Sequence, residues 1–196
     1  MRHCYFFPVS CAVLLMLLHK NCFHANAEFT DLINTTCKQC SDKSTSFKYD
    51  FCLASLQAIP AGHVVNLQGL ALVTLELTLE NATATISIIE EILNSGKFDT
   101  FSVRCLKDCL ELYADSTSTL IDSIVAFLSK QYETTTLLLT AVMEATSTCE
   151  EEFKKKEERK SPVTQENNNV FHLSEIAVCT VGLLSTALDS TKPSLF

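Results

Sequence analysis

Residues 72–93 read LVTLELTLENATATISIIEEIL, and this stretch decides the fold class. Its apolar residues recur in steps of three and four, at Leu72, Leu75, Leu79, Ala82, Ile86, Ile89 and Leu93. Such spacing places them on one face of an α-helix of about 30 residues. The helix is expected to end near Asn94-Ser95-Gly96, because glycine readily adopts the left-handed conformation that closes a helix.

Three further stretches repeat this spacing. Their apolar positions are Val103, Leu106, Leu110, Tyr113, Leu120, Ile124 and Phe127, then Leu138, Val142, Ala145, Cys149 and Phe153, then Val170, Leu173, Ala177, Val181, Leu184 and Leu188. Ser161-Pro162 interrupts the chain before the last stretch, and Thr164 is a candidate N-cap. Four amphipathic helices with short connections predict an all-α protein, an up-and-down four-helix bundle.

Residues 28–62 differ from the bundle helices. Two shorter helical stretches, 29–38 and 47–58, are joined by a polar segment, 41–46. We expect an N-terminal helical hairpin packed on one end of the bundle, which would occupy residues 63–190. Hairpin and bundle together (28–190) would form one domain, followed by a C-terminal tail at 191–196.

The first 27 residues have the layout of a secretory signal peptide. A basic start is followed by an apolar run, Tyr5 to Leu18, and by Ala25-Asn26-Ala27, a small-x-small cleavage pattern. A helix of that run would span about 21 Å, less than the ~30 Å hydrocarbon core. The mature chain is therefore expected to be secreted and to hold no membrane span.

Composition excludes several classes of function. The chain has 196 residues, with 15 Lys and Arg against 23 Asp and Glu, and removing 1–27 with Arg2 and Lys20 lowers the net charge from −8 to −10. So acidic a protein lacks the broad basic face that binds nucleic acid. Only four Gly and four Pro leave little material for the turns of a β-sandwich or for a phosphate-binding loop.

Cysteines and sequons fit an oxidising compartment. Seven cysteines remain after residue 27, so at least one stays free or pairs with another molecule. Two glycosylation sequons begin at Asn34 and Asn81. Asn81 lies on the far side of its predicted helix from the apolar stripe, so a glycan there would point to solvent.

No catalytic constellation is visible in the sequence. The mature chain has two histidines, His63 and His172, in separate segments and without zinc-site spacing. Cys37-Lys38-Gln39-Cys40 has the C-x-x-C spacing of a redox motif but follows no predicted strand. We therefore interpret it as a disulfide cysteine beside a spare thiol. The tract 150–156 places Glu before Lys at i,i+4 three times, which is typical of a solvated helix end. We expect no enzyme activity, no metal and no cofactor, and a protein that acts by binding.

Several strings, taken together, resemble one family. They are Tyr49-Asp50-Phe51-Cys52, the run from Asp108 to Ser116, Thr148-Cys149-Glu150 and Ser161-Pro162-Val163-Thr164, and with their spacing they cover about residues 30 to 188. In order and spacing they are similar to the plant invertase and pectin methylesterase inhibitors. The resemblance implies the same hairpin and bundle.

The resemblance also implies disulfides Cys37–Cys52 and Cys109–Cys149. Cys40, Cys105 and Cys179 lie outside that framework. Cys105 lies one helical turn from Cys109, so a 105–149 bond is an alternative, and Cys40 offers the same ambiguity against Cys37.

The implied function is inhibition of a plant carbohydrate-active enzyme in the apoplast, in a 1:1 complex. Invertase inhibitors of the family are described as inserting a Pro-Lys-Phe loop into the active site. The matching candidate target-contact loop here is Lys130, Gln131, Tyr132, Glu133 and Thr134. Its residues Tyr132-Glu133-Thr134 stand opposite the motif and differ from it at all three positions. Glu133 would bring an anion towards the catalytic carboxylates, whereas Lys130 and Tyr132 could partly substitute for the motif.

The target therefore stays open between acid invertase and pectin methylesterase, which the family's other inhibitors contact through a helix face. Negative charge would favour encounter with a basic esterase. Two alternatives from other classes are a secreted pollen or storage protein of the same fold without inhibition, and a carrier of a small apolar ligand. The carrier would need a persistent apolar cavity, which stripes of ordinary Leu and Ile do not favour.

Overall fold

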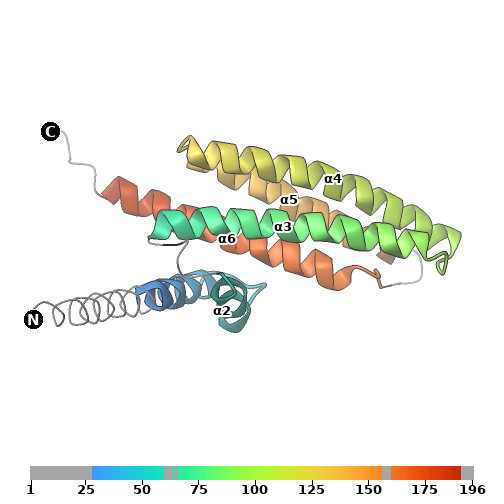
Figure 1. Ribbon diagram of the computed structural model, residues 1–196, viewed down its shortest axis with the longest axis horizontal. Coiled ribbons are helices and arrows are strands. Elements are labelled where there is room, and N and C mark those ends of the chain that lie inside the picture. Colours follow the sequence, from blue (N-terminus) through green and yellow to red (C-terminus); the bar gives the residue numbers. More distant parts are fainter. Residues whose placement is uncertain (1–27, 60–63, 65, 156–159, 191–196) are drawn as a thin grey trace, which may run out of the picture.

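The computed structural model describes residues 28–59, 64, 66–155 and 160–190, and these form six helices without a strand (Figure 1). A first helix covers 28–41. It is followed by α2 (Tyr49–Gln57), α3 (Leu67–Asn94), α4 (Thr100–Leu128), α5 (Tyr132–Lys154) and α6 (Thr164–Ser190). The predicted all-α class is confirmed. The predicted signal peptide, 1–27, and tail, 191–196, lie outside the described residues.

Helices α3 to α6 form the predicted up-and-down bundle. Each packs against the next along the chain, and α6 returns to pack against α3, which closes the four-helix arrangement (Figure 1). The largest fully buried side chains of the bundle include Tyr113, Phe127 and Phe153. The core is continuous along the bundle, from Ile89 and Cys105 near one end to Phe127 and Leu139 near the other.

Local capping explains the boundaries of α3 and α4. The Asn66 side chain accepts a hydrogen bond from the Gly69 amide at the start of α3, and Asp99 does the same for Phe101 and Ser102 at the start of α4. Gly96 has φ +65°, the left-handed conformation predicted for it. Thr164 differs from the prediction. It is the first residue of α6, and its hydroxyl donates to the Ser161 carbonyl instead of capping the helix.

The core stripes include buried threonines that the apolar pattern did not predict. On α5 the predicted Val142, Cys149 and Phe153 are buried, whereas Leu139 and Thr146 are buried in place of the predicted Leu138 and Ala145. On α3, Thr74, Thr78 and Thr85 are buried. Each of these α3 hydroxyls donates to the carbonyl four residues earlier, so the polar group is satisfied within its own helix. A pattern that counts only apolar residues cannot find such positions.

The N-terminal hairpin has a core of its own. The first helix and α2 contribute Phe29, Ile33 and Leu56, which pack with Leu70 of α3 and Ile176 of α6. The hairpin therefore lies beside α6 at one end of the bundle, on the side away from α4 (Figure 1).

Three disulfides cross-link the described residues. Cys37–Cys52 closes the hairpin and Cys109–Cys149 joins α4 to α5, the pairs implied by the resemblance. A third bond, Cys40–Cys179, joins the hairpin to α6. Cys105 is buried and is the free thiol of the described chain, so the alternative 105–149 pairing does not occur.

By length and composition, α3 and α6 could each cross a membrane, so the expectation of no membrane span is not supported by those two criteria. Both helices bury an apolar face in the bundle, and long core helices have the same composition.

The third disulfide is expected to be reduced first. Cys37, Cys52, Cys109 and Cys149 are fully buried, whereas Cys179 is half-buried and lies with Cys40 at a surface pocket of about 350 Å³. A thiolate must reach the sulfur that it attacks, so mild reductant will open 40–179 before the others. Alkylation and peptide mass mapping will measure the order. Early opening of 37–52 or 109–149 would contradict this prediction.

Removing the same bond is expected to destabilise the protein. The double variant Cys40→Ala/Cys179→Ala opens a link between residues 139 apart in sequence, which should lower the free energy of unfolding by about 2–5 kcal/mol. Urea denaturation is the measurement. Cys105→Ala, which leaves all three disulfides, is the matched control.

Candidate functional site

The connection between α4 and α5 is a tight turn of three residues, 129–131, at the tip of the bundle. The Lys130 amide donates to the Phe127 carbonyl and the Gln131 amide to the Ala126 carbonyl, both at 2.9 Å. These two bonds form a Schellman motif, in which the residue after the cap takes the left-handed conformation. That residue is Lys130, with φ 60°, where glycine is usual. A side chain in this conformation costs about 1 kcal/mol, and such strain often marks functional positions.

Only part of the predicted contact loop is a loop. Tyr132, Glu133 and Thr134 form the first turn of α5, so the expectation of a loop over 130–134 is wrong for these three residues. The Tyr132 ring is half-buried and packs against the Phe127 ring, with the centroids 5.7 Å apart. Lys130 and Gln131 are exposed. The Schellman motif closes α4 within the three residues 129–131, so α5 can begin at Tyr132 and the loop is shorter than predicted.

Glu133 lies at the N-terminus of α5, where its negative charge is favourable. It lies in the first turn of α5, whose N-cap Gln131 makes no side-chain capping bond. A carboxylate there is stabilised by the partial positive charge of the helix N-terminus. Its negative charge is therefore partly offset by its own helix.

A groove begins beside this turn and runs between α5 and α6. Tyr132, Leu137 and Thr140 line it from α5, and Gly182 and Ser185 line it from α6, around a volume of about 1010 Å³. Leu137 is 71% exposed. Gly182 leaves open space where a side chain would stand.

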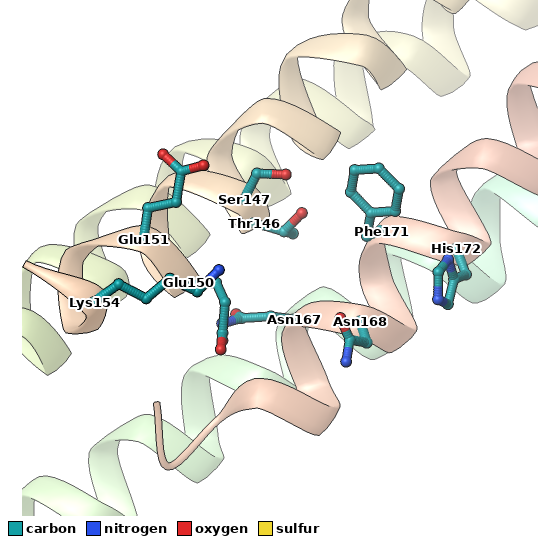
Figure 2. Close-up of a pocket in the computed structure, with 9 residues that line it drawn as sticks. All are labelled: Thr146, Ser147, Glu150, Glu151, Lys154, Asn167, Asn168, Phe171 and His172. Atoms are coloured by element: carbon teal, nitrogen blue, oxygen red, sulfur yellow. The ribbon is translucent and has the colours of Figure 1, made fainter. Parts of the chain in front are cut away.

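The groove continues along the same two helices. A hollow of about 450 Å³ shares Thr140 with it, and a pocket of about 250 Å³ shares Ser147, Glu151 and Phe171 with that hollow. Figure 2 shows this last pocket, with Phe171 of α6 facing Ser147 and Glu151 of α5. The surface between α5 and α6 is thus hollowed from the α4–α5 turn to the start of α6.

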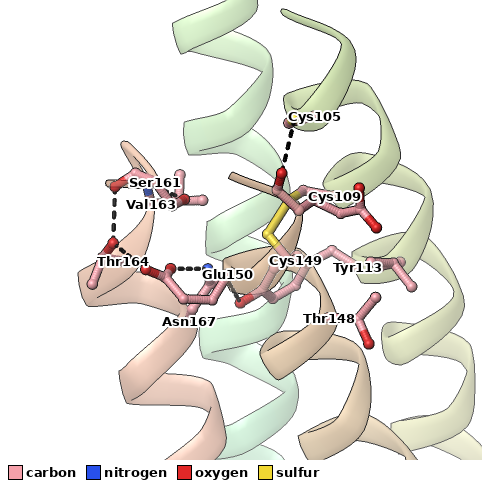
Figure 3. Close-up of a disulfide and its surroundings, with 12 residues drawn as sticks. Cys105, Cys109, Tyr113, Thr148, Cys149, Glu150, Ser161, Val163, Thr164 and Asn167 are labelled. Carbon is pink, nitrogen blue, oxygen red and sulfur yellow. Dashed lines mark hydrogen bonds between the residues drawn. A yellow bond between two sulfur atoms is a disulfide. The ribbon is translucent and has the colours of Figure 1, made fainter. Parts of the chain in front are cut away.

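A polar network lies beneath this pocket, next to the Cys109–Cys149 disulfide (Figure 3). The Tyr113 hydroxyl donates to Asn167 Oδ1 at 2.9 Å, and Asn167 Nδ2 donates to Glu150 Oε2 at 2.9 Å. The Thr164 hydroxyl donates to Glu150 Oε1 at 2.8 Å. Burial raises the pKa of Tyr113 well above its usual value, so the hydroxyl keeps its proton. The network joins α4, α5 and the start of α6.

Glu150 was predicted differently from the sequence. The charged tract indicated an exposed Glu150–Lys154 pair, whereas Glu150 instead accepts from Thr164 and Asn167. Within the described part of this tract, Lys155 forms an ion pair with Glu152, at i,i+3. Lys156, expected to pair with Glu152, lies outside the described residues.

Both sequon asparagines lie in helices. Asn34 Oδ1 accepts from the Tyr49 hydroxyl at 3.1 Å, and Asn81 Nδ2 donates to the Leu77 carbonyl at 2.8 Å. Asn81 is half-buried. Glycosylation at either position stays a prediction.

His172 lies where the hairpin meets α6. Its ring is T-shaped against Phe51 and its Nδ1 is 3.4 Å from the Ser46 hydroxyl, which also bonds Glu175. Burial lowers the pKa of His172, and the nearby Glu175 carboxylate offsets part of that effect. The folded state therefore favours the neutral ring.

Comparison with known proteins decides the family. The description "Plant invertase/pectin methylesterase inhibitor" belongs to a family model that matches residues 31–179. The chain belongs to this family. Membership makes it a non-catalytic enzyme inhibitor.

The most similar relatives include two plane-tree proteins. "Putative invertase inhibitor" names proteins of Platanus acerifolia and Platanus orientalis, each 36% identical over 154 residues, 79% of this inhibitor and 86% and 90% of the relatives. "Cell wall / vacuolar inhibitor of fructosidase 2" of Arabidopsis thaliana is 31% identical over 96 residues, about half of each chain.

Solved structures share the fold. A mutant form of a pectin methylesterase inhibitor from Arabidopsis matches with a TM-score of 0.65 and 23% identity, over 75% of this inhibitor and 95% of that chain. A pectin methylesterase inhibitor from Arabidopsis thaliana matches with a TM-score of 0.56 and 25% identity, over 78% and 95%.

Glu150 is expected to contribute far more to the stability of the inhibitor than the neighbouring Glu151 does. Glu150→Ala leaves the buried Asn167 amide without its acceptor, which should cost about 1–3 kcal/mol of unfolding free energy, whereas the Thr164 hydroxyl keeps the Ser161 carbonyl as an acceptor. Glu151→Ala removes an exposed carboxylate and should change it by less than about 0.5 kcal/mol. Urea denaturation of both variants is the measurement. Equal losses would contradict the role of the network.

His172 is expected to make stability depend on pH. Because its folded pKa is lowered, the unfolded chain binds the extra proton more readily, so stability falls as pH drops through and below the ordinary histidine value of 6.5. Thermal unfolding measured across that range should show a smaller slope in His172→Gln. An unchanged slope in this variant would assign the pH dependence to other groups.

Proposed function

We propose that the protein is a secreted, cell-wall inhibitor that blocks an acid invertase in a 1:1 complex. The observation that carries the proposal is Lys130, exposed at the tip of the α4–α5 turn in a left-handed conformation. This turn matches the loop through which the family's invertase inhibitors are described as reaching their target. The names of the plane-tree relatives and of the Arabidopsis fructosidase inhibitor support the same target.

The chemistry of the turn suits a glycosidase. Most such enzymes use a pair of carboxylates flanking the scissile bond. A lysine ammonium complements these carboxylates, and the adjoining Tyr132 ring, held by Phe127, offers an aromatic edge. Glu133 would oppose the approach, but the N-terminus of α5 offsets part of its charge.

Pectin methylesterase is the second candidate target. The hollowed surface between α5 and α6 offers a helix face for docking, and the net charge of −10 expected for residues 28–196 favours encounter with a basic enzyme. The solved structures that share the fold are named as pectin methylesterase inhibitors.

Secretion is supported by the disulfides and by the leader-like residues 1–27. A carrier function has less support, because the hollows that line the described helices are open surface grooves and the stripe residues fill the core.

The test is a titration of purified acid invertase and pectin methylesterase with the oxidised chain 28–196 at mildly acidic pH. We expect invertase inhibition that Lys130→Glu weakens by about 10-fold or more, because the cation becomes an anion facing carboxylates. Lys97→Glu is the matched control, since Lys97 is an exposed lysine in the turn between α3 and α4, at the opposite end of the bundle.

If the chain inhibits pectin methylesterase but not acid invertase, pectin methylesterase replaces acid invertase as the proposed target. If neither enzyme loses activity at micromolar protein, the proposed function is wrong for both targets. Equal weakening by the two lysine variants would remove the α4–α5 turn from the contact surface.

A further inference from the structure

The Cys40–Cys179 disulfide joins two units that are each held together without it. The hairpin has a disulfide and an apolar core of its own, and so does the bundle. In the described chain, Cys40–Cys179 is the one disulfide that links the hairpin to the bundle. Opening it therefore leaves the cross-links within each unit intact.

The other contacts between the hairpin and the bundle are noncovalent, and part of them is open to water. The Ser44 hydroxyl donates to Glu175 Oε1 at 2.8 Å, and the Ser46 hydroxyl donates to Glu175 Oε2 in an exposed position. Water can replace hydrogen bonds of this kind, so their net contribution is small. Apolar contact is made with Leu70 and Ile176, which the hairpin covers. Without the disulfide, docking of the hairpin depends on this apolar contact.

A surface pocket gives access to the same disulfide. It has a volume of about 350 Å³ and lies between the hairpin and α6, with Lys43 and Phe47 among its lining residues. Cys40 is 1% exposed whereas Cys179 is half-buried, so a reagent reaches the Cys179 sulfur more readily. Gly182 lines the pocket about one turn after Cys179, and a Cβ there would meet no heavy atom within 4 Å. The pocket therefore has room for a small reagent beside the sulfur.

We propose that Cys40–Cys179 is a redox-sensitive latch, which a small dithiol opens through this pocket to release the hairpin from α6. With the bond intact, the hairpin and the bundle unfold as one unit. With the bond open, the hairpin separates from α6 while the bundle stays folded. Accessible disulfides are the labile and regulatory ones, whereas buried disulfides resist reduction. The inference does not depend on the proposed function, because it concerns only how the hairpin and the bundle are joined.

The exchange has two steps. One thiolate of the dithiol attacks Cys179 Sγ to form a mixed disulfide, and the electron pair of the broken S–S bond leaves with Cys40 Sγ, which takes up a proton. The second thiolate then attacks the reagent's own sulfur in the mixed disulfide, and Cys179 Sγ leaves and takes up the second proton. The protein gains two electrons and two protons, and the dithiol loses them and becomes a cyclic disulfide.

The test is amide hydrogen–deuterium exchange of the oxidised chain 28–196 before and after treatment with a low concentration of dithiothreitol. Alkylation and mass mapping of parallel samples show which bond has opened. Opening of 40–179 alone should raise exchange in the hairpin, 28–57, by about 10-fold or more, because the hairpin then opens without unfolding of the bundle. Amides of α4 and α5 should keep their protection.

Variants separate the latch from a general effect of reductant. Cys40→Ala/Cys179→Ala should show the raised hairpin exchange without dithiothreitol, and dithiothreitol should not raise it further. Cys105→Ala keeps all three disulfides and should respond as the wild type does. Gly182→Leu fills the pocket and should slow opening of the bond by about 10-fold, whereas Ser118→Leu at an exposed position of α4 should not.

Three results would overturn the inference. The first is unchanged exchange in the hairpin once 40–179 is open. The second is an equal rise in the hairpin, α4 and α5, because the bond would then stabilise the whole fold instead of holding the hairpin. The third is equal rates of opening in Gly182→Leu and Ser118→Leu, which would remove the pocket as the route of the dithiol.

Discussion

Helix α6 is buried on two sides, and this double burial holds the hairpin and the bundle together. Val170, Ala177 and Val181 pack into the bundle core, while Ile176 packs into the hairpin core. A helix enclosed in this way is apolar around most of its circumference, which explains its membrane-like hydropathy. Cys179 then makes the contact between the two cores covalent. Hairpin and bundle therefore share one helix and are expected to unfold together.

Interhelical hydrogen bonds between polar side chains fix the positions of the bundle helices relative to one another. The hydroxyls of Thr74 and Thr78 on α3 donate to their own helix, so these residues fill space between helices without specifying a partner. The network of Tyr113, Asn167 and Glu150 does specify partners, because each hydrogen bond joins two different helices. In the described chain no buried side-chain nitrogen or oxygen lacks a hydrogen bond, which such a core requires. The network and the Cys109–Cys149 bond hold one end of α5 in place while its other end carries the candidate contact turn.

The first half of α4 is cross-linked to other helices, whereas its last two turns lead into the candidate contact turn. Its first half is tied to α5 and α6 through Cys109 and Tyr113. Its last two turns have no cross-link in the described chain and lead into Lys130, whose left-handed conformation closes the helix. A rigid base and a short strained tip suit a contact surface, because little conformational freedom is lost when a preorganised segment binds.

The helices, their order and the family could all be predicted from the amino-acid sequence. Apolar spacing and capping residues are local signals, so the end of α3 near Asn94-Ser95-Gly96 followed from neighbouring residues. The partner of Cys40, the role of Glu150 and the conformation of Lys130 became known from the folded arrangement of the helices. Each of these depends on distances between residues far apart in the chain or on how two helix ends meet, and the periodicity of a single helix carries no information about either.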